Sequence, residues 1–217
     1  MGKQETLKTD LVCSIIQFVR ENHAEAIDKA YAYFWDDNNP DEFMSGTALS
    51  LGFLNFEDWL IFDYKVNNEK ETFIDLYMKN HTVKDDEAAL LNNIKDSVIS
   101  LYEVSSVAKD KQIRLKDLLM DSEHALRDKA LTRGLNKGDI FATRLLTLDG
   151  KPCMSGCVYP YSAGHKKTVL VYVDKQFKRY IKNVNPEGTM RDFLKDYGDV
   201  LNVIRMNLIM NPPKKTG

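Results

Sequence analysis

Two carboxylates stand out as residues that could do chemistry, because they border a strongly apolar segment. Asp58 and Asp63 lie in the stretch LGFLNFEDWLIFDY, which is dense in aromatic side chains. A carboxyl group held among apolar side chains has a raised pKa and can act as a general acid. Helix capping and exposure to water explain both residues more simply. An enzyme with an unfamiliar hydrolytic site near Asp58 and Asp63 is therefore the alternative hypothesis.

The sequence lacks the common motifs of nucleotide-dependent enzymes, hydrolases and zinc proteins. It contains no Walker loop, no dinucleotide glycine fingerprint, no nucleophile elbow and no paired-histidine metalloprotease motif. Cys153 and Cys157 lie four residues apart on a predicted strand, without the two-residue spacing of a structural zinc site. We therefore expect no metal and no cofactor, and an enzyme is the less favoured class.

A second set of candidate residues is basic and lies in the second half of the chain. Its members are Lys111, Arg114, Lys116, Lys167, Lys175, Lys178, Arg179 and Lys182. The first three fall on one predicted strand, with imperfect alternation. Small β barrels with a basic face bind nucleic acid through phosphates while aromatic rings stack on the bases, and Tyr159, Tyr161 and Tyr172 could supply rings. A solvated charged face is the simpler alternative.

The charges change sign along the chain. Up to Ala108 there are 9 lysine and arginine residues against 20 aspartate and glutamate residues, and the remainder has 21 against 12. Two interpretations stay open. Either the acidic and basic halves attract each other, or the basic half meets an anionic partner, such as nucleic acid or an acidic protein surface.

Apolar spacing predicts that residues 1–98 form an acidic helical region. Apolar residues recur at helical spacing from Leu7 to Val19, and a second helix is expected to end near Trp35, before the polar segment DDNNPDE. A short helix capped by Asn55 follows. Two more helices are expected in ETFIDLYMKNH and in DDEAALLNNIKDSVIS.

Residues 99–162 change to short, partly alternating runs separated by turn sequences. The runs are YEVSSV, QIRLKDLL, HALRDKAL, DIFATRLLTL and MSGCVYPY. Asp149 and Gly150 predict a tight hairpin because both residue types accept the positive φ angles of a two-residue turn. Five such strands are enough for a small antiparallel barrel-like unit.

Residues 163–217 are predicted to form a basic C-terminal helical region. The segment 168–182 fits a helix by its spacing, but TVLVYV also suits a strand, because it is rich in β-branched and aromatic residues. Thr189 and Asp192 form a capping-box start for a last helix that ends at Pro212 and Pro213. The expected fold class is α+β, as three regions or one integrated domain.

The number of cysteines and the hydropathy of the chain indicate the compartment in which the protein functions. Three cysteines, an odd number, and the polar start MGKQETLKTD predict a reducing, cytoplasmic location. No apolar run approaches the roughly 20 residues that cross a bilayer, so we expect no membrane partner. The oligomeric state is left open.

Five segments between residues 53 and 161 follow one another in a recognisable order. They are FEDWLIFDY, SLYEVSSV, IRLKDLLMDSEH, LNKGDIFATRLLTLDGK and MSGCVYPY. Together they resemble a family of uncharacterised bacterial proteins that often accompany a SEC-C zinc motif. The end of this chain, MNPPKKTG, has no cysteine or histidine, so the resemblance does not imply zinc here. It implies a fold and supplies no catalytic residues.

The leading hypothesis is a non-enzymatic binding or adaptor protein. It rests on the lack of a recognisable catalytic constellation and on the basic residues beside the predicted β unit. The expected partner is nucleic acid or an acidic protein surface.

Overall fold

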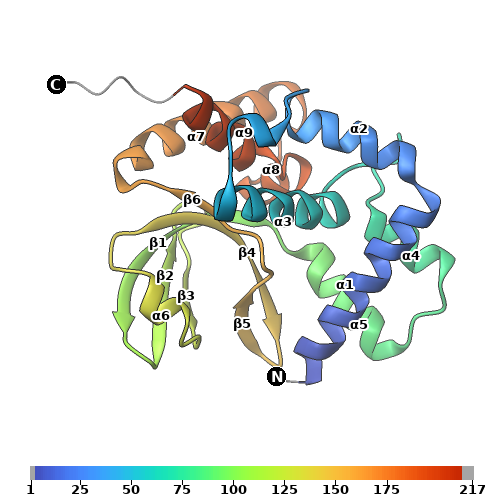
Figure 1. Cartoon of the computed structure of the whole chain (residues 1–217), viewed down its shortest axis with the longest axis horizontal. Helices are drawn as coiled ribbons and strands as arrows, with labels where there is room; N and C mark the ends of the chain where they lie inside the picture. Colours follow the sequence, from blue (N-terminus) through green and yellow to red (C-terminus); the bar gives the residue numbers. More distant parts are fainter. Residues whose placement is uncertain (1–2, 212–217) are drawn as a thin grey trace. The chain divides into compact units, whose positions relative to one another are not determined.

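A computed structural model describes residues 3–211 and confirms the α+β class (Figure 1). The chain divides into two compact units. The first runs up to Ser97 and includes Leu146–Lys151, and the second comprises Val98–Leu145 and the chain from Pro152 onward. Helices build the first unit, whereas a nearly closed antiparallel sheet and further helices build the second.

The first unit follows the predicted order of helices. Its elements are α1 (Lys3–Asn22), α2 (Ala24–Phe34), the 3-10 helix η1 (Pro40–Glu42), α3 (Gly46–Phe62), α4 (Phe73–Asn80) and α5 (Asp85–Asp96). The predicted end of the second helix near Trp35 is confirmed. Asp36 and Asp37 follow with φ angles of 51° and 57°, a left-handed conformation that aspartate tolerates better than most residues and that cannot continue a helix.

The aromatic segment belongs to one long helix, so the prediction of a short helix capped by Asn55 was wrong. α3 begins after Ser45, and Asn55 lies in its middle, where it is fully buried. Local sequence favoured a cap, but packing surrounds the C-terminal half of α3 on most of its sides. Gly52 lets the indole of Trp35 come close, because a Cβ at this position would lie 2.9 Å from Trp35 Cη2.

Aromatic rings form the core of the first unit. Phe34 on α2 lies 5.4 Å from Phe56 and 5.1 Å from Trp59 on α3, measured between ring centroids, and all three are buried. Such ring contacts contribute beyond the area they bury. At the start of α4, Thr72 and Asp75 form a capping box, which satisfies amide groups that the helix leaves unpaired.

The sheet of the second unit has one strand more than predicted. Its strands are β1 (Ile99–Ala108), β2 (Gln112–Asp117), β3 (Glu123–Leu126), β4 (Ile140–Leu148), β5 (Lys151–Met154) and β6 (Tyr159–Tyr161). They are ordered β3-β2-β1-β4-β5, and β6 pairs with β4. The prediction missed one strand because the run before Tyr161 is split: the chain leaves β5, bends, and re-enters as β6.

The predicted hairpin between β4 and β5 is confirmed. Asp149 and Gly150 have φ angles of 49° and 70°, as a two-residue turn requires. The tip belongs to the first unit: the Asp149 amide donates to Gln4 Oε1 of α1 at 2.6 Å, and the Thr147 amide donates to Asn93 Oδ1 of α5 at 3.4 Å. These bonds anchor the turn outside the sheet.

The inner face of the sheet is apolar except around Asp117. Its buried residues are Tyr102, Val104, Ile113, Leu115, Leu126 and Phe141. At the end of β2, Asp117 is fully buried, and its Oδ1 accepts hydrogen bonds from Ser100 Oγ at 2.7 Å and from the amides of Leu119 and Met120 at 2.9 Å. This carboxylate joins β1 to the turn that follows β2.

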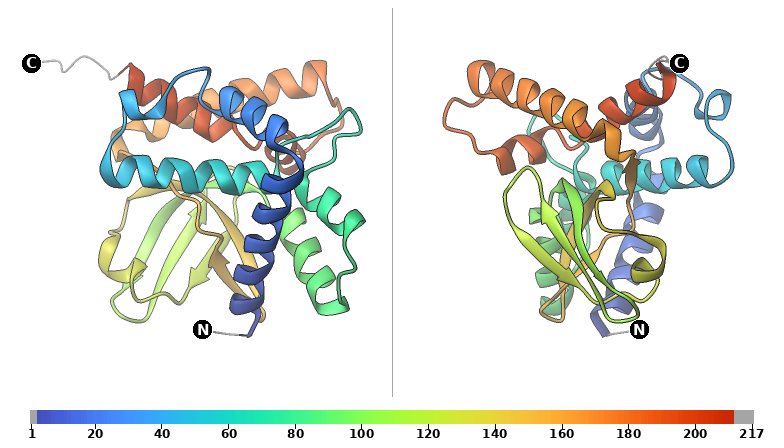
Figure 2. Two further views of the ribbon diagram at one scale, coloured as in Figure 1. Left: turned by 45° about the vertical axis from the view of Figure 1, so that its right-hand side comes forward. Right: turned by 90° about the vertical axis from the view of Figure 1, so that its left-hand side faces the viewer.

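Helices complete the second unit. They are α6 (Leu131–Gly134), the 3-10 helix η2 (Ala163–His165), α7 (Lys166–Asn183), α8 (Met190–Asp196) and α9 (Val200–Met210). α8 and α9 contact β1, and α7 contacts α8 and α9 (Figure 2). The capping box of Thr189 and Asp192 is confirmed, but the single last helix predicted from it is two helices. Pro212 and Pro213 lie outside the described residues.

The structure also corrects the predicted placement of two cysteines. Cys153 lies on β5, whereas Cys157 is buried after that strand, so the two do not share a strand as predicted. A turn at Lys137 and Gly138 connects α6 to β4. In residues 3–211, no helix is both long enough and apolar enough to cross a membrane.

Candidate functional site

The open choice for residues 168–182 is settled in favour of a helix. Val169, Val173 and Tyr180 are buried at spacings of four and seven, which places them on one side of α7. The β-branched residues that suggested a strand are accommodated because a packed, apolar stripe outweighs local preference. The opposite side of α7 therefore faces water.

Five of the eight predicted basic residues share that exposed side of α7. They are Lys167, Lys175, Lys178, Arg179 and Lys182, all exposed, and we call them the α7 cation face. Their spacings of three, four, seven and eleven are those of residues that lie on one side of an α-helix. The sequence alone could not establish this, because it left open whether the segment was a helix.

Some charges of the α7 cation face have partners on the same helix. Lys178 pairs with Asp174 at 2.7 Å, and Arg179 Nη1 donates to Gln176 Oε1 at 3.3 Å. Exposed pairs of this kind contribute little and exchange readily. Lys167, Lys175 and Lys182 have no ion-pair partner among residues 3–211. The face thus keeps a net positive charge.

The other three predicted cations lie apart from α7, on β2 or in the turn before it. Lys111 is in the turn before β2, so its assignment to the strand was wrong, while Arg114 and Lys116 point outward from β2. Lys116 pairs with Asp121 at 3.5 Å and lies between Glu103 and Glu123 on the neighbouring strands. These acidic neighbours offset the charge of Lys116.

A small pocket borders the α7 cation face. It has a volume of about 230 Å³ and is lined by Tyr172, Gln176, Arg179 and Asn183 of α7, by Phe193 and Tyr197 near α8, and by Asp199, Val200 and Val203 near α9. Arg179 belongs to both the face and the pocket. Burial, and next the negative charge of Asp199, raise the pKa of Tyr172, so its hydroxyl stays protonated at neutral pH.

Of the three predicted stacking rings, only Tyr172 remains available. Tyr159 is fully buried, and the Tyr161 hydroxyl donates to the carbonyl oxygen of Leu201 at 2.6 Å. Burial raises the pKa of Tyr161. Tyr159 is therefore a core residue, and the hydroxyl of the half-buried Tyr161 is already engaged. Tyr197, which is 39% exposed, was not among the predicted rings, because the apolar pattern predicts a continuous helix where α8 and α9 are separate.

The two acidic residues proposed for catalysis are buried rather than exposed. Asp58 is 8% exposed on α3, and Asp63 is 3% exposed at the C-terminal end of that helix. Each of the two residues forms a hydrogen bond, an ion pair or another electrostatic interaction. Neither lines the cavity between α1, α2 and α3, whose α3 wall is made of Phe53, Phe56, Glu57, Leu60 and Ile61. The explanation by surface exposure was wrong, and a hydrolytic role gains no support from this lining.

No metal centre is evident in the part of the chain that the structure describes. Within residues 3–211, no three histidine, cysteine or acidic side chains cluster as metal ligands would.

A comparison with known protein families finds a match that covers the sheet and α7. The model of a family of unknown function, DUF7986, matches residues 51–195. The chain belongs to this family. The DUF7986 span begins within α3 and ends within α8, so it includes the whole α7 cation face as well as Tyr172. No curated protein and no solved structure matches the chain.

Proposed function

We propose that this member of DUF7986 is a non-enzymatic binding protein that holds single-stranded nucleic acid on the α7 cation face. The observation that carries the proposal is the alignment of five exposed basic side chains along one side of α7. Phosphate groups along a strand are met by such a row of cations, largely without regard to base sequence.

The pocket beside the row supports nucleic acid over an acidic protein surface. Tyr172 and Tyr197 offer aromatic rings there, and Arg179 offers a guanidinium plane next to them. Bases of single strands stack on aromatic and guanidinium groups, whereas an acidic protein has no need of a ring-lined pocket. After Ala108 the chain has 21 basic residues against 12 acidic ones, and this excess of positive charge attracts a polyanion over a longer range.

Binding can be measured by fluorescence anisotropy with a labelled single-stranded oligonucleotide and the full chain. We expect binding at low salt that weakens as salt rises, with a slope of log K against log salt of about −3 if most of the α7 cation face meets phosphates. The triple variant Lys175→Glu, Arg179→Glu, Lys182→Glu should abolish it. All three residues are exposed, so the fold should be retained.

A matched control has the same charge change on the same unit. Lys109, Lys129 and Lys137 are also exposed, lie outside α7, and can be replaced by glutamate together. Equal loss of binding in the two triple variants would mean general attraction and would overturn the α7 site. Absence of binding at low salt would reject nucleic acid, and nuclease-resistant capture of an acidic protein by α7 would favour the other partner class.

We also infer a cytoplasmic location. Its support is that the chain has three cysteines, an odd number, which suits a reducing compartment. The resemblance to proteins that accompany a SEC-C motif stays a prediction.

A further inference from the structure

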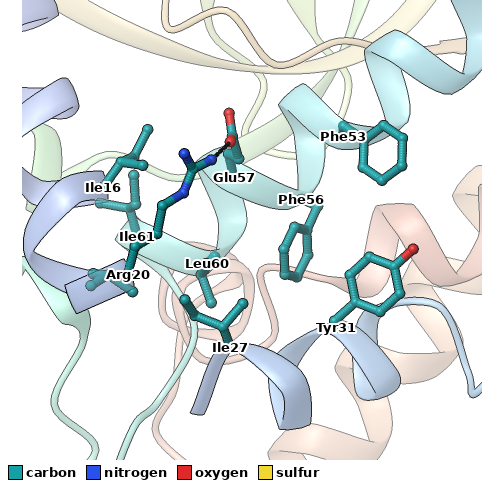
Figure 3. A pocket seen from close by; sticks show the side chains of 10 residues that line it. Ile16, Arg20, Ile27, Tyr31, Phe53, Phe56, Glu57, Leu60 and Ile61 are labelled. Carbon is teal, nitrogen blue, oxygen red and sulfur yellow. Dashed lines mark hydrogen bonds and ion pairs between the residues drawn. The ribbon is translucent and has the colours of Figure 1, made fainter. Parts of the chain in front are cut away.

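A second cavity lies entirely within the first unit, apart from α7. It is an apolar hollow of about 350 Å³ between α1, α2 and α3 (Figure 3). Phe56 and Leu60 of α3 and Ile27 and Tyr31 of α2 form its walls. Its volume falls in the range of small-molecule pockets, roughly 300 to 1,000 Å³.

The walls of this hollow are held in place by the core. The ring of Tyr31 meets that of Phe56 edge-on with centroids 5.4 Å apart, and Phe56 and Leu60 are each 6% exposed. Burial, followed by the negative charge of Asp41, raises the pKa of Tyr31, so that its hydroxyl is neutral at physiological pH. A ligand would therefore enter a preformed, uncharged interior.

One edge of the hollow is charged. Arg20 of α1 and Glu57 of α3 form an ion pair of 3.1 Å between Nη2 and Oε1, with side chains 68% and 37% exposed (Figure 3). A guanidinium has five N–H donors and a carboxylate has two acceptor oxygens. Among residues 3–211, this bond is the one hydrogen bond that either side chain makes. Both groups thus have capacity for a ligand.

A cation and an anion side by side at the edge of an apolar hollow are complementary to a zwitterion with an apolar side chain. A carboxylate can bind Arg20, an ammonium can bind Glu57, and the side chain can lie against Phe56 and Leu60. A ligand with a carboxylate alone would place its charge next to Glu57, in a region where 20 acidic residues face 9 basic ones. We propose that this hollow binds a free α-amino acid with a large apolar side chain.

Isothermal titration of the full chain with L-tryptophan tests the ligand class. We expect saturable binding of one molecule per chain. Indole-3-propionate lacks the ammonium and tryptamine lacks the carboxylate, so each should bind at least about tenfold more weakly, the equivalent of one charge-assisted hydrogen bond. The proposal is overturned if millimolar tryptophan gives no saturable heat, or if indole-3-propionate binds as tightly as tryptophan.

Two pairs of variants test the position. Ile27→Trp fills the hollow and should abolish binding, whereas Leu54→Trp, at a 50% exposed position of α3 outside the lining, should leave it unchanged. Arg20→Gln should weaken binding at least about tenfold. Its control is Lys29→Gln, which breaks the exposed pair with Glu25 on α2.

Thermal unfolding identifies any variant that fails to fold. If Ile27→Trp fails to fold, the affinity of Arg20→Gln, a substitution at an exposed position, is the deciding measurement. Unchanged affinity in Arg20→Gln would overturn the site. Because α7 takes no part in this hollow, tryptophan binding should also survive in the α7 triple variant, and the two proposals can fail separately.

Discussion

Replacing Asp117 by alanine should destabilise the second unit substantially. The side chain is fully buried, and its Oδ1 serves three donors: the Ser100 hydroxyl, 2.7 Å away, and the amides of Leu119 and Met120, 2.9 Å away. Alanine removes the acceptor and leaves these donors in place. The turn after β2 and its link to β1 depend on the same atom.

The size of the loss of stability depends on which of the three donors can form a hydrogen bond with water instead. Ser100 is fully buried, so its stranded hydroxyl costs about 1 to 3 kcal/mol. The two amides lie in a partly buried turn, where water can partly replace each hydrogen bond. Losing each of these bonds therefore costs about 1 kcal/mol. The carboxylate is fully buried, so removing it returns some of its desolvation cost. We expect a net loss of about 3 kcal/mol.

The assay is urea unfolding of the full chain, with hydrogen exchange at Leu101 and Leu115 to identify the transition of the second unit. Asp117→Asn keeps an acceptor oxygen and should cost only about 1 kcal/mol. Asp121→Asn is the control: this carboxylate is 92% exposed in the same turn and pairs with Lys116, and asparagine also tolerates the φ angle of 50° at this position, so the loss should be within about 0.5 kcal/mol.

Two results would refute this reasoning. A loss below about 1 kcal/mol in Asp117→Ala would mean that the three hydrogen bonds are easily replaced. Equal losses in Asp117→Ala and Asp121→Asn would mean that any change in this turn is damaging, regardless of burial.

Two further predictions concern the first unit. Gly52→Ala places a Cβ 2.9 Å from Trp35 Cη2, and the overpacking should outweigh the gain in helix propensity by about 1 kcal/mol in urea unfolding, whereas Gly134→Ala, with nothing within 4 Å, should not destabilise. Burial alone would raise the pKa of Asp75, but hydrogen bonds from Lys95 and Thr72 hold it below its usual value. Asp75 therefore stabilises the fold above its unfolded pKa of about 4, and this contribution is lost as the pH falls through the lower, folded pKa. Urea midpoints between pH 6 and 2 should decline less for Asp75→Asn than for the natural chain, and parallel declines would contradict the assignment.

Local patterns predicted most of the elements of this fold. The helical spacing of Leu7 to Val19 predicted α1, and Asp149 with Gly150 predicted the hairpin, because these preferences act within a few residues. Thr189 and Asp192 marked the start of α8 for the same reason. The end of α8 was missed because the apolar stripe continues through the break into α9.

Errors came where distant residues decide burial. Asn55 carries a capping preference, yet it is fully buried within α3, because other helices surround it. Asp58 was expected in water and is 8% exposed. Tyr159 was expected as a surface ring and lies in the core of the second unit. In each case the local sequence describes a preference that packing overrides.

By itself, the sequence determined the α+β class and the order of its elements, because periodicity and turn chemistry are local. It also determined that acidic residues gather in the first half and basic residues in the second. Only the tertiary structure decided which of these charges lie together on one surface. Val169, Val173 and Tyr180 pack inward from one side of the helix α7, so Lys175, Lys178 and Lys182 share its exposed side, while acidic neighbours on adjacent strands offset Lys116. Which side of a helix is exposed depends on the residues that pack against its other side, and those residues lie far away in the sequence.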